Sequence, residues 1–281
     1  GLKDLRLEDN LLSGIGSSLS NMHALRRLTL SHNRLDIGSK KESFVGLKYV
    51  SPSLELLDLS FCSLSSIPSL QIGHLVNLHM LLLNDNEIQN VEGLDNLTSL
   101  RELRLNKNRI RHIDSGSFLR MPHMRELHLE ENLLRSLLHV GPFANLKKLF
   151  LDHNRVTETF ELDRMPFMET VVAVTIRNNP VTRKPNVRLN LIRRFPNVAG
   201  IDGKEVSPEE REKAMQIGQA DSNGNSFALG SVGNAGSSSA PPGTKVPVKL
   251  ASVNFDTQRG MEMMLSDKSH GTHGTGRSGA G

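Results

Sequence analysis

The stretch that decides the fold is residues 100–110, with the sequence LRELRLNKNRI. Aliphatic residues stand at its first, fourth, sixth and eleventh positions, and an asparagine stands at its ninth. The alternation in the middle is that of a short β-strand whose leucines face one side. The asparagine comes where a tight turn needs a side chain that bonds to the backbone. The stretch therefore predicts a strand followed by a turn.

The same pattern recurs along the chain in the same register. Its copies begin at residues 2, 25, 54, 78, 100, 124, 146 and 171, so successive copies start 23, 29, 24, 22, 24, 22 and 25 residues apart. A pattern of this form and period is typical of leucine-rich repeats. One repeat cannot bury its own apolar side, so neighbouring repeats stack and their strands form a parallel sheet. The predicted fold is an α/β leucine-rich-repeat solenoid with a curved parallel β-sheet on its concave face.

The repeats account for residues 1–181, about eight copies in all. The first copy starts in mid-repeat, so we expect the natural start of the protein to precede it. The spacing of 29 residues between the second and third copies indicates an insertion between Leu35 and Leu54. This insertion, which includes Lys40, Lys41, Glu42 and Phe44, is expected to form a short helix or loop on the convex side.

The repeat pattern gives way to a different one after Val181. Leu189, Ile192 and Phe195 are three residues apart, which predicts one face of a short helix that ends at Pro196. Val198 and Ile201 continue the apolar edge, and a second helix is expected to start at Pro208, so residues 182–217 should form a C-terminal cap and helix.

The last part of the chain has a different composition. Residues 218–281 are rich in glycine and serine and are expected to form an irregular tail, disordered unless bound. Within it, residues 245–255 alternate weakly and are expected to be able to add a strand to a partner. This tail is a separate hypothesis from the solenoid.

Charge and cysteine content restrict the possible partners and compartment. The 34 Lys and Arg residues nearly balance 30 Asp and Glu residues, so nothing demands a nucleic-acid or membrane partner. The single cysteine, Cys62, excludes an internal disulfide, whereas extracellular repeat proteins usually close their ends with disulfide-rich caps. We therefore expect an intracellular protein. Cys62 stands at the asparagine position of the third copy and is interpreted as a small buried residue; a reactive thiol is the alternative.

The side chains that flank each strand leucine are predicted to lie on the concave face. Leu56, Met80 and Leu82 then form one apolar patch on adjacent strands, and Phe150 is a separate exposed aromatic residue. An apolar patch on a usually polar face indicates a partner, although loops or a preceding segment could cover it. Charged residues flank the patch and could set the register of a partner. The predicted partner-binding residues on the concave face are Leu56, Met80, Leu82, Arg104, His128 and Phe150.

A search for catalytic chemistry gives one weak cluster. Glu126, His128, Glu130 and Asp152 could together bind a divalent metal, but strand neighbours that point the same way are often merely solvated. The sequence has no phosphate loop, no H-E-x-x-H and no G-x-S-x-G motif. We therefore assign no catalytic, cofactor or metal residue and predict a non-enzymatic protein.

Nucleic-acid binding is a third class of function for this sequence. The basic pairs Arg183-Lys184 and Arg193-Arg194 lie in the expected cap without interleaved aromatic residues. Direct binding to nucleic acid is therefore not predicted, and a nucleic-acid role would have to pass through a partner protein.

The cap motifs NNPV (178–181), FPNV (195–198) and IDGKEV (201–206) resemble the Sds22-like family of intracellular leucine-rich-repeat proteins. Residues 78–215, with RELRLNKNRI (101–110) and FELD (160–163), most resemble the ciliary proteins called leucine-rich repeat-containing protein nine. This resemblance implies a scaffold in the cytoskeleton of the cilium or flagellum. Its partners would be other proteins of the axoneme, and the chain would be a monomer within a larger hetero-assembly. The alternative is a regulatory subunit that positions an enzyme such as a phosphatase in the cytoplasm or nucleus.

Overall fold

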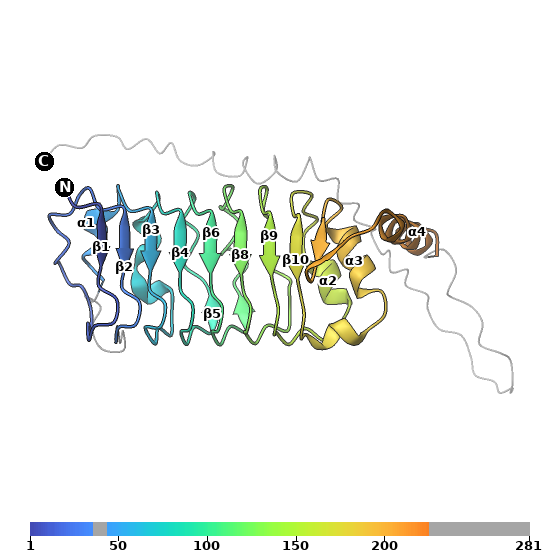
Figure 1. The fold of residues 1–281 in the computed structure, drawn as a ribbon, viewed down its shortest axis with the longest axis horizontal. Coiled ribbons are helices and arrows are strands. Elements are labelled where there is room, and N and C mark those ends of the chain that lie inside the picture. The colour runs from blue at the N-terminus through green and yellow to red at the C-terminus, as the bar shows by residue number, and fades with distance from the viewer. Residues whose placement is uncertain (36–43, 225–281) are drawn as a thin grey trace, which may run out of the picture. The chain divides into compact units, whose positions relative to one another are not determined.

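A computed structural model describes residues 1–35 and 44–224 (Figure 1). Its main feature is a ten-stranded sheet in the order β1-β2-β3-β4-β6-β8-β9-β10-β11-β12. Neighbouring strands are parallel except for the last pair, β11 and β12. The eight repeat strands are β1 Asp4–Arg6, β2 Arg27–Thr29, β3 Leu56–Asp58, β4 Met80–Leu82, β6 Glu102–Arg104, β8 Glu126–His128, β9 Lys148–Phe150 and β10 Ala173–Thr175. This architecture confirms the predicted leucine-rich-repeat solenoid.

The core lies on one side of this sheet. In the repeat strands from β2 to β10 of the main sheet, the middle residue is completely buried, and the aliphatic residue two positions after it is buried as well, as with Leu103 and Leu105. The strand residues on either side of the middle one point the other way and stay at least partly accessible to solvent. We call the surface that they form, together with the first polar residue after each strand, the open face.

Short elements form the opposite side of each repeat. β5 (Asn90–Val91) and β7 (His112–Ile113) pair as a second, parallel two-stranded sheet. Other repeats use α1 (Leu47–Val50), the 3₁₀ turns η1 (Pro68–Leu70) and η2 (Ile72–His74), and α2 (Phe160–Arg164). Phe44 and α1 belong to the predicted insertion, and Phe44 is buried in the core. Residues 36–43, which include Lys40, Lys41 and Glu42 of that insertion, lie outside the described part of the chain.

Buried asparagines join successive repeats as a ladder. The Asn108 side-chain amide donates to the carbonyls of Leu83 (2.8 Å) and Leu105 (3.0 Å), and its oxygen accepts from the Ile88 N–H (3.1 Å). The same contacts recur at Asn86, Asn132, Asn154 and Asn179. Each ladder residue satisfies backbone groups that the turn leaves unpaired.

Cys62 takes the ladder position in the third repeat, as predicted. Its thiol lies 3.2 Å from the carbonyl oxygens of both Leu30 and Ser60, and the residue is completely buried. Burial raises the pKa of the Cys62 thiol to about 11. A neutral, buried thiol agrees with the structural interpretation of this residue rather than with a reactive one.

The C-terminal cap consists of η3 (Pro180–Arg183), α3 (Val187–Arg194), β11 (Gly200–Ile201), β12 (Lys204–Glu205) and α4 (Pro208–Gly224). α3 buries Val187, Leu191 and Ile192, and Phe195 follows in the core. The predicted face was therefore partly wrong, because Leu189 is only half-buried and Leu191 takes its place. Spacings of three and four alternate on a helix, and the helix starts at Val187, which puts residues 187 and 191 on the buried side.

Two further features of the cap were not predicted. Asp202 and Gly203 form a turn with positive φ between β11 and β12, and this hairpin adds two strands to the end of the sheet. α4 starts at Pro208 as expected but extends to Gly224, so the helix continues into the segment predicted to be irregular from residue 218. The predictions for residues 225–281 lie outside the described residues. Among the residues described, none forms a helix of the length and apolar character needed to cross a membrane.

Candidate protein-binding face

The open face is organised in rows because the strands are in exact register. Leu56 is paired with Met80, Met80 with Glu102, and Glu102 with Glu126 in the first row. A second row continues from Asp58 through Leu82, Arg104, His128 and Phe150. All six residues predicted to bind a partner therefore lie on one face of five consecutive strands.

The apolar patch is found where it was predicted. Leu56 and Met80 are direct neighbours on β3 and β4, and Leu82 follows two residues after Met80 on the same side of β4. The three side chains are partly exposed. Charged groups border the patch, because Asp58 is the neighbour of Leu82 on one side and Arg104 is its neighbour on the other. The patch is thus a small apolar area bordered by charged side chains.

The prediction that Phe150 is a separate exposed aromatic residue was wrong. Its ring stacks on the ring of His128, with centroids 4.3 Å apart and planes inclined by 24°, and it is only partly exposed. His128 itself is 13% exposed. The two residues are register partners on β8 and β9, so their proximity could have been found by aligning the repeats. Together they form a stacked aromatic pair two strands away from the apolar patch.

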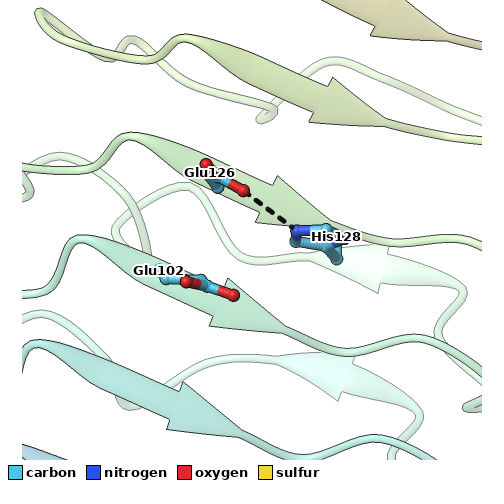
Figure 2. Close-up of side chains that lie close together, drawn as sticks. All are labelled: Glu102, Glu126 and His128. Carbon is cyan, nitrogen blue, oxygen red and sulfur yellow. Dashed lines mark ion pairs between the residues drawn. The ribbon is translucent and has the colours of Figure 1, made fainter.

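Carboxylates lie close to His128, and Figure 2 shows two of them, Glu102 and Glu126. Its Nε2 atom lies 3.6 Å from a carboxylate oxygen of Glu126, and its Nδ1 atom lies 3.5 Å from one of Glu130. Burial by itself would raise the pKa of the Glu126 carboxyl. The hydrogen bond and charge of Lys148, which lies 3.0 Å away, and the charge of His128 outweigh the effect of burial, so the pKa of Glu126 is lowered. Glu126 is thus held as a carboxylate between two basic side chains.

The acidic cluster differs from the one predicted. Asp152 does not complete it, because the Arg177 guanidinium bonds to one carboxylate oxygen of Asp152 (2.9 Å) and the Arg177 N–H bonds to the other (2.7 Å). Instead, Glu102, Glu126 and His128 bring potential ligand atoms within 4.8 Å of one another. Glu102 is already bonded to Arg104 at 2.5 Å and Glu126 to Lys148. The structure therefore gives these carboxylates cationic partners from the chain itself.

Several polar atoms of the open face are buried without a hydrogen-bond partner among the described residues. They belong to Ser60, Asn106, His128, Glu130 and Thr175. Sequence reasoning missed Ser60, Asn106 and Thr175 as candidates. Ser60 and Asn106 stand at the third outward position of their repeats, next to the two rows that hold the six predicted binding residues. Buried polar atoms without partners are costly, and a bound protein surface could satisfy them.

Comparisons with known proteins agree with this architecture. Two family models described as leucine-rich repeat match the chain, one over residues 98–156 and the other over residues 53–75. A solved leucine-rich-repeat protein of Leptospira interrogans has the same fold, with a TM-score of 0.55 and 22% identity over 73% of this chain and 56% of that one.

Curated relatives match over part of their length. The chain is 30% identical to asporin of Bos taurus over 64% of this chain and 49% of that protein. It is 32% identical to U2 small nuclear ribonucleoprotein A' of Homo sapiens over 48% of this chain and 44% of that protein. Tubulin-specific chaperone E of Danio rerio is 26% identical over 76% of this chain and 44% of that protein. The chain thus spans about half the length of these relatives.

Repeat pattern, sheet, asparagine ladder and family models lead to one assignment. Leucine-rich repeats are generally binding modules, and their extended sheets provide the surface. The chain folds as a leucine-rich-repeat solenoid, and residues 53–75 and 98–156 match leucine-rich-repeat family models.

Proposed function

We propose that the chain is a non-enzymatic scaffold that binds a partner protein through the open face of its sheet. The observation that carries this proposal is the combination on five adjacent strands of the apolar patch Leu56-Met80-Leu82 with the stacked pair His128-Phe150. The core of an interface is typically apolar and aromatic, and its rim is polar. The charged residues Asp58 and Arg104, which are the neighbours of Leu82 on the adjacent strands, would supply such a rim.

The polar atoms of the open face support the same proposal. Ser60, Asn106 and Glu130 each keep a buried oxygen without a partner among the described residues. Their row lies beside the row of Leu82, Arg104 and His128. A partner that supplies donors and acceptors along this row would gain hydrogen bonds without breaking any that the chain makes within itself.

We further propose that this scaffold is a structural component of the ciliary or flagellar axoneme. The support is the resemblance of residues 78–215 to ciliary leucine-rich-repeat proteins. The alternative is a regulatory subunit that positions an enzyme such as a phosphatase. The two differ in behaviour, because an axonemal scaffold stays with microtubules through washing, whereas a regulator is extracted and changes the kinetics of its enzyme.

The experiment compares wild-type chain, Leu82→Glu and Leu119→Glu in isolated axonemes. Leu82 is in the apolar patch, whereas Leu119 is 63% exposed and lies in a turn outside the open face, so it is the matched control. We expect wild type and Leu119→Glu to be retained after washing and Leu82→Glu to be lost. Loss of all three chains, with wild type changing phosphatase kinetics, would favour the regulator. Equal retention of all three would contradict binding through the open face.

A further inference from the structure

A row of basic side chains runs along the edge at which the central strands begin. His79, Arg101, Arg125 and Lys147 immediately precede β4, β6, β8 and β9. The N–H of Arg101 donates to the carbonyl of His79 at 2.8 Å, that of Arg125 to Arg101 at 2.7 Å, and that of Lys147 to Arg125 at 2.7 Å. These residues are therefore direct neighbours in consecutive repeats, about 4.8 Å apart along the sheet. We call Arg101, Arg125 and Lys147 the basic strip.

The basic strip is not neutralised by the part of the chain that the structure describes. All three side chains are exposed, and none forms an ion pair with a described residue. The carboxylates that follow them in sequence, Glu102 and Glu126, are bonded to Arg104 and Lys148 instead. Earlier in the same row, by contrast, Arg26 is paired with Glu55 at 3.0 Å. Like charges on neighbouring strands are destabilising, so a bound anionic group would relieve this repulsion.

Neighbouring side chains shape the surface around the basic strip. The three basic residues line a groove of about 290 Å³ together with His123 and Asn145. The Asn145 amide donates to the Pro122 carbonyl at 2.8 Å, which fixes one wall of the groove. Burial lowers the pKa of His79, and the positive charge of Arg101 lowers it further, so the positive charge of this edge comes from the three residues of the basic strip.

We propose that the basic strip is a docking site for an acidic α-helix of a partner protein. A helix lying across the strands places residues i, i+4 and i+7 on one side at intervals of roughly 5 Å, which matches the strand separation. In an extended segment, by contrast, the residues on one side are about 6.6 Å apart. Their spacing does not match the strand separation, so they would lose register with the basic strip over three repeats. Arginine and lysine reach such carboxylates with exposed, flexible side chains.

This inference rests on the proposed function because it takes the partner to be a protein. It uses no residue of the apolar patch. The probe is a synthetic peptide of about 20 residues, long enough to be helical, with glutamates along one side at i, i+4, i+7 and i+11. A second peptide of the same composition spreads the glutamates around the helix. Fluorescence anisotropy measures the binding of each peptide to the full chain.

The variants are Arg125→Glu and, as the matched control, Arg111→Glu. Arg111 is also exposed, forms no ion pair with a described residue and lines a different groove. We expect Arg125→Glu to weaken binding of the patterned peptide about tenfold and Arg111→Glu to change it less than about twofold, with both affinities falling as salt increases. The patterned peptide should bind more tightly than the scrambled one.

Three results would overturn the inference. The first is equal binding of both peptides, and the second is an unchanged affinity in Arg125→Glu. The third is tighter binding of a DNA duplex that depends on Arg125, which would assign the strip to nucleic acid. The Leu82→Glu variant separates this inference from the proposed function, because it should retain peptide binding even though it loses the open-face partner.

Discussion

Single buried asparagines hold successive turns of the solenoid together, and Asn108 illustrates their importance. Its side chain makes hydrogen bonds to the backbone of the preceding repeat and to its own strand. We expect Asn108→Ala to lower the free energy of unfolding by roughly 2–3 kcal/mol, because it leaves buried backbone groups unpaired. Urea unfolding measures this loss. Asn77→Ala, which removes one exposed hydrogen bond to Pro52, is the control and should cost less than about 1 kcal/mol. Equal losses would contradict the role of the ladder.

Cys62 offers a second test at the residue scale. Because burial raises the pKa of its thiol to about 11, the reactive thiolate is scarce at neutral pH. We expect a thiol reagent to label the native protein far more slowly than the urea-unfolded protein at pH 8. The raised pKa also makes the contribution of Cys62 to the free energy of unfolding depend on pH. This contribution is complete at pH values below the ordinary pKa of a cysteine thiol and is lost as the pH rises toward 11. Rapid labelling of the native protein would contradict the buried-ladder interpretation.

Individual elements of the cap are joined by one arginine. Arg188 of α3 donates to the Glu210 carboxylate at 2.7 Å and to the carbonyls of Ile201 and Glu205 at 3.1 and 2.7 Å. Glu210 in turn accepts from the Ser207 N–H at 3.1 Å, which forms a capping box at the start of α4. α3, the hairpin and α4 are therefore bonded through a single side chain.

We expect Arg188→Met to destabilise the protein by about 1–3 kcal/mol at pH 7. The hydrogen bond from Arg188 lowers the pKa of Glu210. The stabilisation that this pair provides is therefore complete at pH values above the ordinary pKa of glutamate, and it is lost as the pH falls through the lowered pKa of Glu210. The difference in unfolding midpoint between wild type and Arg188→Met should thus shrink between pH 7 and pH 3. A difference that grows on acidification would contradict this assignment.

The elements that could be predicted are those that a local pattern specifies. The strand leucines and ladder asparagines repeat at fixed offsets, so β1 to β10 of the main sheet followed from spacing alone. The hairpin β11–β12 did not, because strands of two residues have no periodicity and its turn depends on positive φ at Asp202 and Gly203. The stacking of Phe150 on His128 and the pairing of Asp152 with Arg177 depend on contacts between repeats, which a search within single repeats did not consider.

At the scale of the described repeats, the sheet presents two surfaces of different character side by side. The open face combines an apolar patch with an aromatic pair, and the adjoining edge carries the basic strip. Both surfaces come from residues that the core does not need, because the buried middle leucine of each strand is independent of its outward neighbours. The same scaffold can therefore carry different partner specificities.

The most direct test of binding through the open face is cross-linking mass spectrometry on the native source, comparing wild type with Leu82→Glu and Leu119→Glu. We predict links from β3, β4 and β6 to axonemal proteins in wild type and in Leu119→Glu, and their loss in Leu82→Glu with the fold unchanged by circular dichroism. An unchanged set of links in folded Leu82→Glu would contradict the account and move the partner to another face.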